Sequence, residues 1–222
     1  MPDPTAPNFW PRYVAGALRT ESLQAGLPAS ALHDRRILHA CVGLATELIE
    51  LEAWLDGGWT NTDHAEISKL SSQLDPATPD RLMKARNRLV VEEIGDMIWY
   101  MALLVDALDL PIKEVFLPAN PASLLLAMDP VRNLKMAVGQ VIDDIGKRHV
   151  FYGKVLDRQI LIQQLSSLAY GLTRVARLAD STLVRAGQRN HAKLEARYPE
   201  RFTSQAALSR DREAEHAALG SS

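Results

Sequence analysis

Two pairs of acidic residues are embedded in apolar stretches of the chain. Glu47 and Glu50 lie within one such stretch, and Glu93 and Asp96 lie within another. The acids of each pair are three residues apart, a spacing that makes them neighbours on one face of a helix. Burying two like charges there costs on the order of several kcal/mol for each carboxylate unless a cation neutralises them. The spacing therefore predicts a cation site.

If the two acidic helices pack side by side, Glu47, Glu50, Glu93 and Asp96 come together. Carboxylate oxygens are hard ligands that favour Mg²⁺, with Mn²⁺ as an alternative, and they leave positions for water and a substrate phosphate. The competing interpretation is that the pairs are solvated faces of two surface helices, which is the usual position of glutamates. Apolar neighbours such as Leu48 favour the metal site.

The elements needed to position these acids are helices. Apolar residues recur at helical spacing in both acidic stretches, and no segment shows the alternation of period two that marks a strand. Residues 1–12 are expected to form a loose arm tied down by Trp10 and Tyr13, and a short helix is expected from 15 to 24. Further helices are expected at 30–56, with Ser30 as N-cap, and at 66–74, 80–110, 112–117, 131–149 and 157–186. The sequence thus predicts an all-α helical bundle of two helix-hairpin units.

The second half of the chain resembles the first in its arrangement of helices, but the aligned positions carry no acids and the connection is shorter. We divide the chain into an N-terminal arm (1–30), a unit with the intact acidic motif (31–120), a degenerate unit (121–205) and a C-terminal tail (206–222). Such weak self-similarity also arises by chance between two amphipathic hairpins.

The composition is typical of a globular protein. Hydrophobic residues make up 47% and charged residues 23% of the 222 residues, and the net charge of −2 gives no reason to expect a nucleic-acid partner. Cys41 is the only cysteine, which excludes a disulfide framework and favours a reducing compartment. Without a signal peptide or an apolar run of membrane-spanning length, we expect a cytoplasmic protein that does not bind membranes.

The two acidic pairs, with the segments 147–158 and 190–202, resemble the MazG-like all-α nucleoside triphosphate pyrophosphohydrolases. That family carries Glu-x-x-Glu on one helix and Glu-x-x-Asp on the next, followed by a basic connection and a C-terminal segment with lysine, arginine and Tyr-Pro. The resemblance covers residues 13–216. The long connection between the acidic pairs and the missing acids of the second unit depart from the family pattern, so the chain resembles a fused tandem with one surviving metal site.

The resemblance implies hydrolysis of a nucleoside triphosphate, expected to be a deoxyribonucleotide, to the monophosphate and pyrophosphate. Mg²⁺ would be held by Glu47, Glu50, Glu93 and Asp96, with catalytic roles for Glu50 and Glu93 and with Glu50 as the candidate general base.

The remaining candidates are residues that would contact the substrate. Clustered bases near such a site suit phosphate oxygens. The candidate substrate-binding residues are Lys193, Arg197, Lys147, Lys154, Arg158, Asn190 and Tyr152. The candidates for stacking on the base are Trp54, Trp59 and Trp99.

Family members generally act as dimers or tetramers with sites built across subunits, so the resemblance also implies a homo-oligomer such as a dimer. The alternative function is a catalytically inactive nucleotide-binding or structural protein derived from such an enzyme. A di-metal carboxylate oxidase is disfavoured, because the bundle helices lack Glu-x-x-His pairs.

Overall fold

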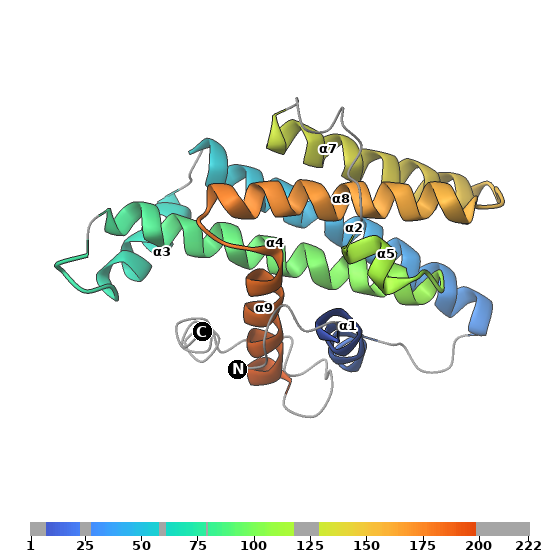
Figure 1. Cartoon of the computed structure of the whole chain (residues 1–222), viewed down its shortest axis with the longest axis horizontal. Coiled ribbons are helices and arrows are strands. Elements are labelled where there is room, and N and C mark those ends of the chain that lie inside the picture. The colour runs from blue at the N-terminus through green and yellow to red at the C-terminus, as the bar shows by residue number, and fades with distance from the viewer. Residues whose placement is uncertain (1–7, 23–27, 58–60, 79, 118–128, 199–222) are drawn as a thin grey trace.

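The computed structural model describes residues 8–22, 28–57, 61–78, 80–117 and 129–198, and every regular element within them is a helix (Figure 1). The elements are α1 (Phe9–Arg19), α2 (Ala29–Asp56), α3 (Asn61–Ser72), α4 (Arg81–Ala107), α5 (Ile112–Phe116), α7 (Pro130–Val141), the π-helix η1 (Ile142–Phe151), α8 (Arg158–Leu178) and α9 (Leu183–Arg197). The predicted all-α fold is confirmed. Within these ranges, no helix has both the length and the apolar character needed to cross a bilayer.

The helices form two hairpins that pack against each other (Figure 1). α2 and α4 lie along each other, with α3 near the turn between them. α7 continues into η1, and α8 returns along them and contacts α4. α9 crosses α4 steeply near its middle, and α1 lies beside α9. α9, the last described helix of the second half of the chain, therefore packs against α4, the acidic helix of the first half.

α4 is the central helix of the fold. It contacts α1, α2, α3, α8 and α9, and its side chains between Leu89 and Val105 are mostly buried. Ile94, Met97 and Ile98 are fully buried, and each contributes about 1.5–3 kcal/mol by leaving water. The acids Glu93 and Asp96 are thus carried by a helix whose surroundings are largely apolar.

The break between α8 and α9 corrects the expected continuous helix over 157–186. α8 ends at Leu178, and Asp180 follows with φ of 52°, a left-handed conformation that a helix interior does not accept. Thr182 then starts α9 by accepting a hydrogen bond from the backbone N–H of Arg185. The break turns α9 away from α8 and across α4.

The N-terminal expectations are also partly wrong. The expected arm over 1–12 already becomes helical at Phe9, where α1 begins, and α1 ends at Arg19 rather than at 24. Trp10 and Tyr13 are buried, as expected for residues that tie this segment down. Ser30 is not an N-cap, since α2 begins one residue earlier. The tail 206–222 lies outside the described residues.

Candidate active site

The two acidic helices bring three carboxylates together. Oxygen atoms of Glu47 on α2 and of Glu93 and Asp96 on α4 all lie within 4.8 Å of one another. Within the described ranges, this is the group of acidic, histidine or cysteine side chains that is close enough to share a metal ion. Glu93 is buried, whereas Glu47 and Asp96 are half-buried, so the cluster opens toward solvent on one side.

Glu50, the fourth expected ligand, lies one turn further along α2 and is exposed. It is outside the group of mutually close oxygens, but its negative charge raises the pKa of Glu47. The structure thus places Glu50 at the rim of the cluster rather than within it.

The carboxylates of the cluster carry more negative charge than the nearby positive charges balance. Burial, followed by the charges of Asp96 and Glu50, raises the pKa of Glu47 to about 7. Burial and the charge of Asp96 also raise the pKa of Glu93 well above its usual value. For Asp96 burial raises the pKa, although the nearby Lys193 partly counteracts it. A divalent cation at this point would relieve the repulsion.

Two predicted substrate-binding residues of α9, Lys193 and Asn190, instead contact the acids of α4. The Nζ atom of Lys193 lies 2.7 Å and 2.5 Å from the two carboxylate oxygens of Asp96 and 3.1 Å from Oε1 of Glu92. Asn190 donates from Nδ2 to Oδ1 of Asp96 at 2.5 Å. Burial alone would lower the pKa of Lys193, but Asp96 and Glu92 raise it above its usual value, so this lysine is charged.

Two further residues orient the cluster, and the sequence did not identify them in this role. The hydroxyl of Tyr13 donates to Oδ1 of Asn190 at 2.7 Å, which turns the amide nitrogen toward Asp96. Trp54, expected to stack on a base, is buried and donates from Nε1 to Oε1 of Glu93 at 3.1 Å. Trp54 follows Glu47 by seven residues, two helical turns, which is a signal that the sequence offered.

No known protein family, curated protein or solved structure matches this chain.

A glycine permits the close contact between α4 and α9. A Cβ atom on Gly95 would lie 2.8 Å from Cβ of Asn190 and 3.0 Å from the carbonyl oxygen of Ala186. Any side chain at this position would push α9 away from α4. Gly95 stands between Glu93 and Asp96 in the sequence, so the residue that seats α9 lies within the acidic motif itself.

The predicted cationic and aromatic residues between 147 and 158 lie on η1, on the connection that follows it and at the start of α8. These residues are Lys147, Tyr152, Lys154 and Arg158. Arg158 donates to the backbone carbonyl of Asp109, just beyond the end of α4. Asp109 follows Asp96 by thirteen residues, which corresponds to about 20 Å along a helix. Within one chain Arg158 therefore does not reach the acidic cluster.

The remaining predicted residues divide between the site and the scaffold. Arg197, in the last turn of α9, is half-buried, and its charge lowers the pKa of Asp96. Trp99 donates from Nε1 to the carbonyl of Ala17 and to Oγ1 of Thr20, so it ties α4 to α1. Trp59 lies outside the described residues.

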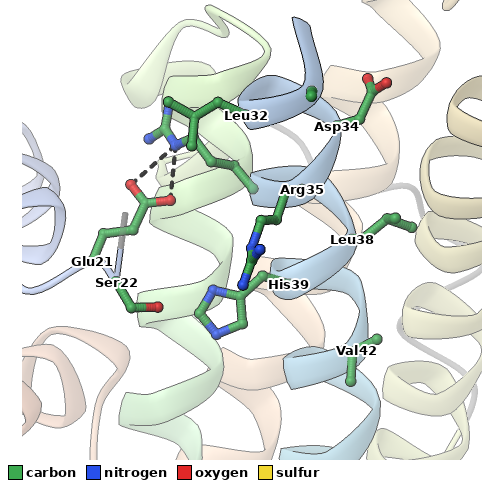
Figure 2. Close-up of a pocket in the computed structure, with 10 residues that line it drawn as sticks. Glu21, Ser22, Leu32, Asp34, Arg35, Leu38, His39 and Val42 are labelled. Carbon is green, nitrogen blue, oxygen red and sulfur yellow. Dashed lines mark hydrogen bonds and ion pairs between the residues drawn. The ribbon is translucent and has the colours of Figure 1, made fainter. Parts of the chain in front are cut away.

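A pocket of about 720 Å³ lies along the first half of α2 and is closed on one side by Glu21 and Ser22 (Figure 2). Arg36 forms an ion pair with Glu21, with Nε of Arg36 lying 2.8 Å and 3.0 Å from the two carboxylate oxygens. His39 also lines the pocket, and burial lowers its pKa, which favours the neutral ring.

Tyr100 lies beside the pocket and packs on α2 at Gly43, about one helical turn before Glu47. The ring of His39 packs edge-on against the ring of Tyr100, with centroids 5.5 Å apart. Burial and the charges of Glu47 and Asp96 raise the pKa of Tyr100 to about 12. His39 precedes Glu47 by eight residues, about 12 Å along α2. A ligand of nucleotide length spans that separation.

Proposed function

We propose that this protein is a cytoplasmic, Mg²⁺-dependent nucleoside triphosphate pyrophosphohydrolase of the MazG-like type, with a deoxyribonucleoside triphosphate as substrate. The observation that carries the proposal is the convergence of Glu47, Glu93 and Asp96 from two helices into one cluster. The Glu-x-x-Glu and Glu-x-x-Asp spacing and the all-helical architecture support the same assignment.

The cluster fits a hard divalent cation. All three contributing groups are carboxylates, which Mg²⁺ and Mn²⁺ prefer, and their oxygens need only small shifts to reach a common ion. The raised pKa values of Glu47 and Glu93 reflect unbalanced negative charge that such an ion would neutralise. When bound, Mg²⁺ would neutralise phosphate charge and lower the pKa of a coordinated water.

The side chains around the cluster hold the acids in place. Trp54 fixes Glu93 by a hydrogen bond, and Asn190 and Lys193 fix Asp96. Glu50 lies at the exposed rim on the same helix as Glu47, so its carboxylate is accessible to an attacking water as a general base.

In this proposal the nucleoside part of the substrate lies in the pocket along α2. Tyr100 packs on α2 between His39 and Glu47, so a base held beside His39 would extend its phosphates past this ring toward Glu47. The pocket is lined by apolar as well as polar side chains, among them Leu38 and Val42, as a heteroaromatic base requires.

In this proposal the basic segment 147–158 contacts the substrate of a partner chain. Arg158 lies too far from the acids of its own chain, and the aromatic residues Phe151 and Tyr152 of this segment are 69% and 70% exposed. In a homodimer, the cations Lys147, Lys154 and Arg158 of one chain would contact phosphates bound by the other.

The test is a panel of ribo- and deoxyribonucleoside triphosphates incubated with Mg²⁺ or Mn²⁺, with pyrophosphate release as the readout. Glu93→Gln should abolish turnover. The control Glu52→Gln changes an acid on the same helix as Glu47 that pairs with Lys135, and it should remain active. If nucleotides bind without turnover, the proposal fails and the alternative of an inactive nucleotide-binding protein takes its place.

A further inference from the structure

Lys193 places a fixed positive charge inside the acidic cluster. Its side chain is 2% exposed, and its ammonium group contacts Glu92 and both oxygens of Asp96. From this geometry we infer that Lys193 occupies the place of a second metal ion and restricts the site to one divalent cation. The inference rests on the proposed function, because it concerns the same metal site.

The hydrogen bonds on Asp96 leave little room for metal coordination. A carboxylate has about four lone-pair positions, two on each oxygen. Oδ1 of Asp96 accepts from both Lys193 and Asn190, and Oδ2 accepts from Lys193. One position therefore remains, on Oδ2. Asp96 can bind one ion through a single oxygen, but it cannot bridge two ions through both.

The ammonium group is itself fully bonded. A lysine ammonium has three N–H donors, and Lys193 directs its bonds to two oxygens of Asp96 and one oxygen of Glu92. Moving it aside for a metal would leave a buried charge without its partners, which is strongly unfavourable. Lys193 therefore remains in place when the single ion binds to Glu47, Glu93 and the free position on Asp96.

A two-metal site requires ions about 3.5–4 Å apart, usually bridged by a carboxylate. Glu92 and Asp96, the acids on the α9 side of the cluster, already have Lys193 as their cation. An ion placed beside them would be repelled by the ammonium charge at close range. The positions left for metal are the carboxylates of Glu47 and Glu93 and one oxygen of Asp96, and these suffice for one ion.

The test counts Mn²⁺ ions bound to each full-length chain by electron paramagnetic resonance, without nucleotide. We expect one ion per wild-type chain, with the spectrum of an isolated Mn²⁺. Lys193→Met should bind a second ion at least about tenfold more tightly than the wild type does, with the signal of an exchange-coupled pair. The control Lys113→Met removes one positive charge from an exposed lysine on α5, beyond the end of α4, and should still bind one ion.

The outcomes separate this inference from the proposed function. Two or more ions in the wild type overturn the inference alone, and so does a folded Lys193→Met protein that binds only one. Binding of no ion overturns both proposals. Circular dichroism with and without Mn²⁺ verifies that the variant is folded. If it does not fold, the wild-type count and spectrum still decide, because a coupled pair in the wild type refutes a site limited to one ion.

Discussion

The substitution Gly95→Ala tests whether α9 is seated on α4 as the structure has it. The added methyl group would lie 2.8 Å from Cβ of Asn190 and 3.0 Å from the carbonyl oxygen of Ala186. Both contacts are with atoms close to or in the α9 backbone, which cannot rotate away. The helix as a whole must therefore retreat, and Asn190 and Lys193 move with it away from Asp96.

The expected size of the effect follows from two costs and one gain. Overpacking a close helix contact costs about 1–3 kcal/mol. Replacing glycine by alanine inside a helix gains about 1 kcal/mol in helix propensity. Weakening the buried contacts of Asp96 adds to the cost, since an unpaired buried polar group costs about 1–3 kcal/mol. We therefore expect a net loss of about 1–5 kcal/mol in the free energy of unfolding.

The chain offers a matched control at Gly139, inside α7, where an added Cβ would meet nothing within 4 Å. Gly139→Ala should gain stability, by about 0.5–1 kcal/mol, from propensity alone. Urea unfolding followed by circular dichroism measures both variants. If Gly95→Ala stabilises the protein as Gly139→Ala does, α9 does not pack against α4 at this glycine, and the contacts inferred for Lys193 lose their basis.

Three further predictions concern the acids and their hydrogen bonds. In metal-free protein the pKa of Glu47 is raised from 4.5 to about 7, so the native state binds this proton more tightly than the unfolded state. The free energy of unfolding should therefore fall as the pH rises from about 4.5 to about 7, by about 1–2 kcal/mol after allowance for the partial exposure of Glu47. Thermal unfolding in EDTA should show this fall. Saturating Mg²⁺ should make it smaller. Glu47→Gln removes one of the mutually repelling charges, so it should raise the melting temperature in EDTA. It should also diminish the stabilisation by Mg²⁺. An unchanged response to Mg²⁺ would exclude Glu47 as a ligand. Tyr13→Phe leaves Oδ1 of Asn190 without its buried donor, so urea unfolding should show a free energy of unfolding lower by about 1–2 kcal/mol. Wild-type stability would mean that Tyr13 does not orient this amide.

The fold class followed from the sequence because apolar periodicity is a local signal. The helices around Glu47 and Glu93 were predicted to within a few residues, since each has a long apolar face and ends near a glycine or proline. The break between α8 and α9 was not predicted, although Thr182 is a good N-cap residue. Apolar periodicity continues on both sides of this break, and it is a stronger signal than the single capping residue.

The candidate site was predictable only where it is local in sequence. The three-residue spacing of Glu93 and Asp96 identified the acids, and the antiparallel packing of α2 and α4 brought Glu47 to them. The hydrogen bond between Tyr13 and Asn190 joins residues 177 positions apart, and no spacing rule connects them. Such contacts depend on how α1 and α9 are placed on α4, which is a property of the whole fold.

The position of α9 gives the second half of the chain a definite part in the site. That half carries none of the clustered acids, yet its last described helix supplies Lys193 and Asn190 to Asp96 of the first half. Without α9, Glu92 and Asp96 would lose their buried cation, and the repulsion that already raises the pKa of Glu93 would increase. A chain that ends before α9 should therefore be less stable than the full chain, chiefly because the acids of the cluster would repel one another more strongly. The second half is better understood as the source of a counter-charge than as a redundant copy of the first.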